Sequence, residues 1–172
     1  AILDHPGRNI LLEAVRSAQR AGKPIAFDPN LRPHLWDSPS QMTESIMQGA
    51  AVSDIALPSF EDEARWFDDA DPEATLNRYA QAGAKTVIVK NGADAVLYRT
   101  SDTNGSVEVP CLPSVVDTTA AGDSFNAAIL AGLATDTPLR DSIALACRLA
   151  GHVVQGKGAL VPINLSVLDQ FR

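Results

Sequence analysis

The stretch 117-DTTAAGDSFNAAILAGL-133 places one carboxylate, Asp123, between a turn of small residues and an apolar run rich in alanine. Small residues let backbone N–H groups approach a ligand closely, and a helix that begins here directs the positive end of its dipole toward the same point. Such an arrangement suits a phosphate group. An aspartate at the start of that helix can act as a general base that accepts a proton from an alcohol beside the phosphate. Asp123 could equally be a first-turn residue that only the helix dipole favours, and the stretch by itself leaves both interpretations open.

Three further polar segments directly follow short apolar runs that have the composition of buried strands. The predicted strands are 25–28, 54–58 and 86–90, and the polar segments are 27-FDPNLRPHLW-36, 57-LPSFEDE-63 and 89-VKNGAD-94. In open α/β sheets, ligands bind beyond the carboxyl ends of the strands. We therefore expect polar groups from these distant parts of the sequence to converge on one ligand.

Helical periodicity appears between the predicted strands and again in the last third of the chain. The predicted helices are 8–21, 39–50, one that starts at Ser59, 72–83, 120–134 and 138–155. Ser59 with an acid three residues later is the pattern that caps a helix N-terminus. Polar turns at 91–94 and 101–105 lead into 94–99 and into VEVPC, which predicts a small antiparallel addition. The alternation of strands and helices predicts an α/β fold with a mostly parallel sheet and helices on both faces.

Composition limits the class of protein and its partners. The 172 residues are 45% hydrophobic and 20% charged, which is typical of a globular chain, and we expect a single domain over residues 1–172. The net charge of −7 and the lack of a basic stretch argue against a nucleic-acid partner. No apolar run approaches the roughly 20 residues that cross a bilayer, which argues against a membrane partner. Cys111 and Cys147 have neither metal-ligand spacing nor the density of a disulfide framework, so a cytoplasmic location is expected.

The stretch 117–133 resembles the second signature of the ribokinase-like (PfkB) carbohydrate kinases, D-T-x-G-A-G-D-x-F, with Ala120 in place of the first glycine. The resemblance implies the fold of that family, a three-layer αβα Rossmann-like architecture with a mostly parallel central sheet and a small antiparallel addition. It also implies that Asp123 is the catalytic base. The small residues Ala120, Ala121 and Gly122 would then line the loop that receives the transferred phosphoryl group.

The segment FDPNLRPHLW is similar to the D-x-N-x-R segment of the 2-keto-3-deoxygluconate kinases and bacterial fructokinases within this family. The similarity implies that Asn30 and Arg32 face the nucleotide phosphates and that Arg32 also faces the substrate. Read without the resemblance, Arg32 is a surface cation. The segment PSFEDE resembles the family's N-x-x-E segment, with Ser59 in place of asparagine, which implies a nucleotide contact at Ser59 and a water-mediated Mg²⁺ site at Asp62 or the adjacent Glu63. A plain helix cap is the alternative.

Three more positions match the family less closely. KNGADA resembles K-x-G-x-x-G, which implies that Lys90, Asn91 and Gly92 line the nucleotide pocket, although a simple hairpin turn is the alternative. Cys147 falls where relatives carry a residue beside the adenine, but a small packing residue is the alternative. Asp117 and Thr119, with the loop around Gly158, resemble the family's monovalent-cation site.

Taken together, the resemblance implies an ATP-dependent kinase that phosphorylates a hydroxyl of 2-keto-3-deoxygluconate, bound by Arg32 and Asp123. ATP and Mg²⁺, with a monovalent cation such as K⁺, are the implied cofactors, and a homo-oligomer is expected of the full-length protein. A fructokinase or another sugar kinase of the family is one alternative. A nucleotide-binding module without catalytic output is another, because the family's N-terminal substrate and lid part has no counterpart here and the resemblance covers only a C-terminal portion.

Overall fold

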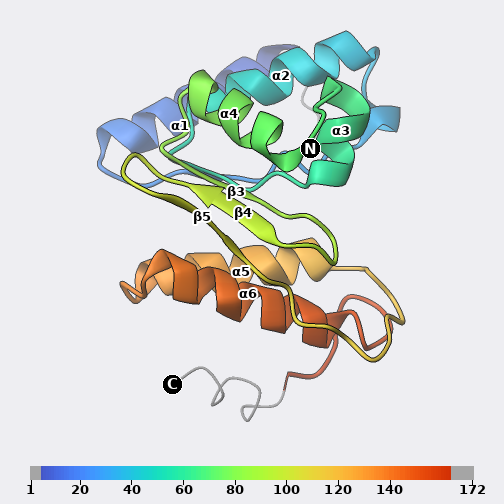
Figure 1. Cartoon of the computed structure of the whole chain (residues 1–172). Helices are drawn as coiled ribbons and strands as arrows, with labels where there is room; N and C mark the ends of the chain where they lie inside the picture. Colours follow the sequence, from blue (N-terminus) through green and yellow to red (C-terminus); the bar gives the residue numbers. More distant parts are fainter. Residues whose placement is uncertain (1–4, 164–172) are drawn as a thin grey trace. The chain divides into compact units, whose positions relative to one another are not determined.

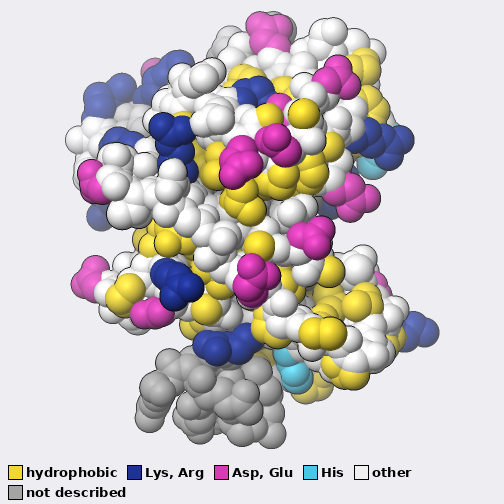
Figure 2. Space-filling view, viewed as in Figure 1, with side chains coloured by type: hydrophobic (Ala, Val, Ile, Leu, Met, Phe, Trp, Pro, Cys, Tyr) yellow, Lys and Arg dark blue, Asp and Glu magenta, His cyan; other side chains and the backbone are white. Residues whose placement is uncertain are grey.

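The computed structural model describes residues 5–163, and these form two compact units (Figure 1). The first unit contains residues 5–92 and 97–106, and the second contains residues 93–96 and 107–163. Figure 2 shows Asp and Glu side chains distributed over the visible face of both units. Among the described residues, no helix has both the length and the apolar character that a membrane crossing requires.

A five-stranded sheet runs in the order β1-β2-β3-β4-β5. The strands are β1 Ala26–Phe27, β2 Ile55–Ala56, β3 Thr86–Val89, β4 Val96–Arg99 and β5 Asn104–Val107. The first three strands pair in parallel, with Ala26 opposite Ile55 and Ile55 opposite Thr86, and β4 runs antiparallel to β3. The predicted α/β class, with its mostly parallel sheet and small antiparallel addition, is therefore confirmed.

Helices of the first unit follow from local start and stop signals. They are α1 His5–Arg20, α2 Pro39–Ala51, α3 Phe60–Phe67 and α4 Pro72–Ala82, with a 3-10 turn at Pro33–Leu35. Helix α4 begins at Asp71, whose carboxylate accepts the N–H of Ala74 at 2.7 Å, and it ends at Gly83, where φ is 123°. A capping side chain and a proline at the first helical position commonly mark the start of a helix, and a glycine commonly marks its end.

The core of the first unit lies between the sheet and helices α2 and α4. Because parallel crossovers are right-handed and the strand order is consecutive, α2 and α4 cover the same face of the sheet, as Figure 1 shows. The fully buried side chains between them include Met42 from α2, Tyr79 from α4, and Val87 and Val89 from β3. This packing fixes where each strand ends, and so positions the polar segments that follow.

At the amino ends of these strands, Asp54 joins three chain segments. Its Oδ2 accepts the backbone N–H of Ile25 at 2.9 Å, and its Oδ1 lies 2.8 Å from Nζ of Lys85. Both contacts lower the pKa of Asp54, and the contact with Lys85 contributes most. The ion pair lies at the end of the sheet opposite to the polar segments, so it serves structure rather than the candidate site.

The second unit is built on a pair of helices, α5 Ala121–Ala134 and α6 Leu139–Val153. They approach closely at Gly132, where an added Cβ would lie 2.1 Å from Oγ of Ser142. Phe125, Ile129 and Ile143 are buried in this unit. Both predicted helices are confirmed, with ends within two residues of those expected.

The antiparallel addition differs in detail from the prediction. Its second turn closes over 100–103, because the Thr100 hydroxyl accepts the N–H groups of Asp102 and Thr103 at 3.2 and 3.0 Å. Strand β5 therefore starts at Asn104, three residues before the predicted VEVPC strand. The connection between β3 and β4 spans residues 90–95 and contains the predicted turn at 91–94, while Lys90 pairs with Ser59 on the β2 side of the sheet.

Candidate active site

Across the carboxyl ends of β1 and β3, Asp28 and Lys90 form an ion pair. Nζ of Lys90 lies 3.2 Å from Oδ2 of Asp28, and the Lys90 side chain is only 11% exposed. The other oxygen of Asp28 accepts the backbone N–H of Asn30 at 3.1 Å, and Asn30 takes a left-handed conformation with φ of 39°. Asp28 thus shapes the turn that carries Asn30 and at the same time holds a cation from a strand that is not its direct neighbour.

Asp62 lies in the first turn of α3, half-buried near the same charges. Burial raises the pKa of Asp62, while Arg32 opposes this rise electrostatically; Glu61 and Asp28 add to it, and Lys90 opposes it. Asp62 therefore lies close enough to both cations to interact with them. Of the charged groups that follow the parallel strands, Asp28 and Lys90 are in contact, and Asp62 interacts electrostatically with both of them and with Arg32.

Ser59 is connected to Lys90 through the backbone. The two residues form a parallel bridge, in which the N–H of Phe60 donates to the carbonyl oxygen of Lys90 at 2.8 Å and the N–H of Lys90 donates to that of Pro58 at 2.9 Å. Ser59 is the N-cap of α3, so the predicted helix start is confirmed, but its side chain makes no capping hydrogen bond, and this part of the prediction is wrong. The N–H group of Asp62, which a capping hydroxyl could accept, donates instead to the carbonyl oxygen of Ser59 at 3.1 Å.

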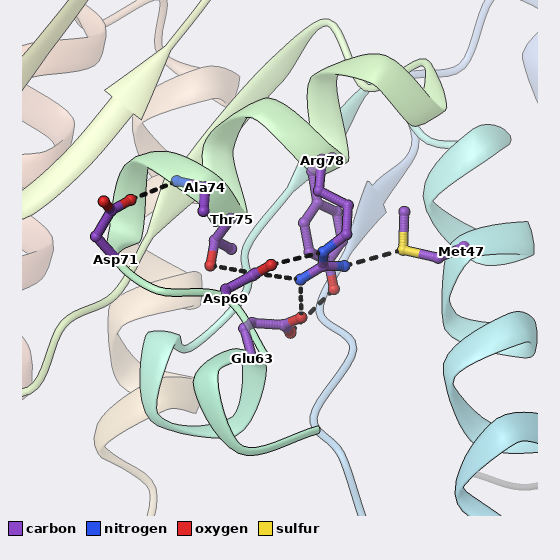
Figure 3. Close-up of polar contacts among 8 residues, drawn as sticks. Met47, Glu63, Asp69, Asp71, Ala74, Thr75 and Arg78 are labelled. Atoms are coloured by element: carbon purple, nitrogen blue, oxygen red, sulfur yellow. Dashed lines mark hydrogen bonds and ion pairs between the residues drawn. The ribbon is translucent and has the colours of Figure 1, made fainter. Parts of the chain in front are cut away.

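Glu63, although adjacent to Asp62, has a different environment (Figure 3). Its side chain is fully buried, with Oε2 at 2.7 Å from Nη2 of Arg78 and Oε1 accepting the hydroxyl of Tyr79 at 3.0 Å. Burial raises the pKa of Glu63, and the hydrogen bonds from Arg78 and Tyr79 oppose that rise. We therefore do not retain Glu63 as a magnesium ligand, because its carboxylate belongs to a buried network with α4.

The remaining nucleotide-pocket candidates are a turn and a thiol. Asn91 is half-buried, and Gly92 takes a left-handed conformation with φ of 61° that favours glycine. Cys147 lies in α6 with 3% exposure, and burial raises the pKa of its thiol to about 11. A thiol in this environment stays protonated and packs as a small apolar group.

In the second unit, Asp117 holds two loops together. Its Oδ1 accepts the N–H and the hydroxyl of Thr119 at 2.9 and 2.6 Å, and its Oδ2 accepts the N–H of Gly158 at 2.9 Å. These bonds lower the pKa of Asp117, and the two from Thr119 contribute most. The structure thus brings Asp117, Thr119 and the Gly158 loop together, as their resemblance to a cation site implies.

The loop 118–120 leads directly into α5. Ala120, the N-cap, has φ of 62° and ψ of 11°, and no side chain caps the helix there. Asp123 is exposed in the first turn. The first N–H groups of a helix have no partner within it, so an uncapped start with a positive dipole end can bind an anion beside this carboxylate.

Among residues 5–163, no group of three or more His, Cys, Asp or Glu side chains is placed to hold a metal ion. This arrangement is compatible with Mg²⁺, which is often bound by one or two carboxylates together with waters and substrate phosphates. Asp62 is suited to that role, because burial disfavours its charge and a cation would compensate it.

Sequence reasoning missed two residues of this region. The sequence pattern predicts no role for Asp28, although it pairs with Lys90. The two residues are the last of the predicted parallel strands 25–28 and 86–90, and that shared position was the signal that could have found the pair. Arg78, the partner of Glu63, lies within a helix whose sequence carries no such signal.

Comparison with protein families matches residues 1–164 to the pfkB family carbohydrate kinase model. The 2-dehydro-3-deoxygluconokinase of Haemophilus influenzae is 37% identical over 163 residues, which cover 94% of this chain and 52% of that protein. The enzyme of the same name from Escherichia coli K12 is 37% identical over 166 residues, covering 94% and 53%. The chain thus spans about half the length of the curated relatives it matches.

Solved structures agree with this result. The aminoimidazole riboside kinase of Salmonella enterica, in complex with aminoimidazole riboside and an ATP analog, is 28% identical with a TM-score of 0.82, covering 98% of this chain and 57% of that one. The fructokinase of Vibrio cholerae O395 shares the fold with a TM-score of 0.85 at 24% identity, again covering 98% and 57%. The fold is therefore ribokinase-like, and the chain belongs to the pfkB family of carbohydrate kinases.

Proposed function

We propose that this chain is the nucleotide-binding and catalytic portion of an ATP-dependent kinase that phosphorylates a hydroxyl group of 2-keto-3-deoxygluconate. The observation that carries the proposal is the exposed carboxylate of Asp123 in the first turn of α5, whose start has no capping side chain. The names of the two bacterial 2-dehydro-3-deoxygluconokinases, which denote the same sugar acid, support the choice of substrate.

In the proposed reaction, Asp123 accepts the proton of the sugar hydroxyl. The hydroxyl oxygen forms a bond to the γ-phosphorus of ATP while the bond from that phosphorus to the β,γ-bridging oxygen breaks, and ADP leaves. The first N–H groups of α5, next to Ala120, Ala121 and Gly122, stabilise the charge on the transferred phosphoryl oxygens. Positioning and electrostatic stabilisation supply most of the catalysis in phosphoryl transfer, because little covalent help from the protein is needed.

Residues of the first unit bind the nucleotide in this proposal. Arg32 and Lys90 are the cations for the phosphates, and the turns at Asn30 and Gly92 and the chain at Ser59 supply polar contacts. Asp62 holds Mg²⁺ through water, and the ion when bound neutralises phosphate charge. In the second unit, Asp117 and Thr119 order the loop before Asp123 and are the residues for a monovalent cation such as K⁺.

The acid substrate is proposed on the basis of Arg32. Its planar guanidinium group can bind a carboxylate with two hydrogen bonds, and 2-keto-3-deoxygluconate carries a carboxylate whereas fructose and ribose do not. The full-length gene product should be assayed with MgATP against all three sugars. A clear preference for a neutral sugar would refute the keto-acid assignment and favour the fructokinase alternative, for which a Vibrio alginolyticus fructokinase 31% identical over 133 residues is the precedent.

The catalytic base is tested by Asp123→Asn. We expect kcat to fall by roughly 10²- to 10⁴-fold while ATP binding is largely kept, because only proton acceptance is removed. Asp141→Asn is a matched control, since Asp141 is an exposed aspartate in the first turn of α6. Near-normal turnover in Asp123→Asn would exclude the assigned role.

A nucleotide-binding module without catalytic output is the second candidate. It is motivated by three departures from the family pattern: Ala120, Ser59, and Ala95, which stands where K-x-G-x-x-G has its second glycine. Titration calorimetry with MgADP, combined with the assay above, separates the two candidates. Tight MgADP binding without phosphoryl transfer to any of the three sugars would favour the module.

A further inference from the structure

The buried network around Arg78 includes Glu63, which is the neighbour in sequence of Asp62, the proposed magnesium-binding acid. Arg78, in α4, contacts Glu63 of α3 and Asp69 of the loop between the two helices, and its Nη1 donates to Sδ of Met47 in α2 at 3.1 Å. Its guanidinium carbon also lies 3.7 Å from the ring centroid of Phe67, at the end of α3. One side chain thus connects three helices and a loop, as Figure 3 shows for the polar contacts.

Helix α3 depends on such contacts for its orientation. It has eight residues, and helices this short are not stable without tertiary packing. Its start is bonded to β3 through the backbone of Lys90, and its only acid with full burial, Glu63, is bonded to Arg78 and Tyr79. Successive helical residues point about 100° apart, so fixing Glu63 toward α4 also fixes the direction of the half-buried Asp62, which lies on a neighbouring face of α3.

We propose that Arg78 and Glu63 are positioning residues that hold Asp62, and with it the magnesium-nucleotide binding residues of the first unit, in a working orientation. This inference rests on the proposed function. Arg78 touches neither substrate nor metal and acts through Glu63. Its guanidinium group reaches Asp69, Met47 and Glu63 through three different nitrogens, Nε, Nη1 and Nη2, and the single nitrogen of a lysine does not reproduce this fork.

The test uses Arg78→Lys in the full-length gene product, below its Tm. We expect the Mg²⁺ concentration for half-maximal activity and the Kd for MgADP by calorimetry both to rise, by up to roughly tenfold, because a direct partner of a metal ligand is typically worth 10- to 100-fold and Arg78 acts on Asp62 only through the adjacent Glu63. The KM for the sugar should stay unchanged. A role in stability alone would lower Tm and the active fraction and leave both half-saturation constants at the wild-type value.

Two further variants complete the test. Lys85→Gln breaks an ion pair at the opposite ends of the strands, so it should leave the Mg²⁺ and MgADP constants within about twofold of wild type. Glu63→Gln keeps the shape of the side chain and serves as the test if Arg78→Lys does not fold. We expect the Mg²⁺ and MgADP constants to rise roughly threefold, because part of the hydrogen bonding at position 63 remains. Wild-type constants in the folded positioning variants would overturn the inference. A wild-type protein that neither binds MgADP nor transfers phosphoryl groups would instead refute the proposed function and the inference with it.

Discussion

Replacing Arg78 with methionine leaves the Glu63 carboxylate, which is 0% exposed, without its counter-charge. Removing one partner of a buried ion pair typically costs about 3–5 kcal/mol. The Arg78 side chain is itself 22% exposed, so the pair is partly screened and we expect the lower end of that range. At pH 8 the free energy of unfolding should therefore fall by about 3 kcal/mol.

The size of this loss should depend on pH, and its sign follows from the pKa of Glu63. Burial raises this pKa above its ordinary value of 4.5, and Arg78 opposes the rise. Without Arg78 the folded-state pKa moves further upward. Between pH 4.5 and that pKa, the folded variant keeps a proton that the unfolded chain has released, so its stability falls as pH rises through this window. The slope is at most about 1.4 kcal/mol per pH unit for one proton.

The assay is urea unfolding of wild type and Arg78→Met at several values between about pH 5 and 8, followed by the fluorescence of Trp66 in α3 and Trp36. The difference between the two proteins should shrink toward the acid end. The control compares Glu63→Gln/Arg78→Met with Glu63→Gln, because neither protein has a titrating group at position 63, so the difference between these two should lack that pH dependence. A difference that is constant across the range, or a loss under about 1 kcal/mol at every pH, would refute the reasoning.

Three other predictions concern the backbone and the surface. Ala120→Gly should raise the free energy of unfolding by about 1 kcal/mol, because glycine takes the conformation at φ of 62° without strain; a lower urea midpoint would contradict this. Gly132→Ala should lower it by about 1–3 kcal/mol, because the new Cβ meets Ser142, and adding Ser142→Ala should recover part of the loss. Asp54→Asn should cost at most about 1 kcal/mol near neutral pH, because Lys85 is 76% exposed. Since the folded-state pKa of Asp54 is lowered, its contribution is present above its ordinary pKa of 3.8 and disappears as pH falls through the lower folded value, which acid unfolding of both proteins would measure.

Local signals accounted for most of the fold. Asp71, Pro72 and Gly83 mark the ends of α4 by side-chain capping, fixed φ and a left-handed stop, and these are properties of single residues that can be read in a sequence. The missing side-chain cap at Ser59 could not be read in this way, because it depends on the N–H group of Asp62 bonding to the Ser59 carbonyl within the first turn of α3. The early start of β5 likewise depends on how the Thr100 hydroxyl closes its turn.

Some features of the candidate site could likewise be predicted from the sequence, and others could not. Asp117, Thr119 and the Gly158 loop were expected together from their resemblance to a known site, and the structure brings them together. The different environments of Asp62 and Glu63 could not be inferred from two adjacent acids, since that depends on which face of α3 meets α4. The position of Arg78 in the sequence likewise gives no indication that it pairs with Glu63, 15 residues earlier.

The bridge between Ser59 and Lys90 has a consequence for how charge is accommodated. It continues the pairing of β2 and β3 beyond their ends, so that the first residue of α3 and the last backbone carbonyl before the 91–94 turn share one hydrogen bond. In the proposed reaction, Asp62 of α3 and Lys90 would therefore be carried by two backbone segments that are hydrogen-bonded to each other. Polar groups held in this way need not reorient as charge moves from the nucleotide to the acceptor, which lowers the reorganisation energy of the transfer.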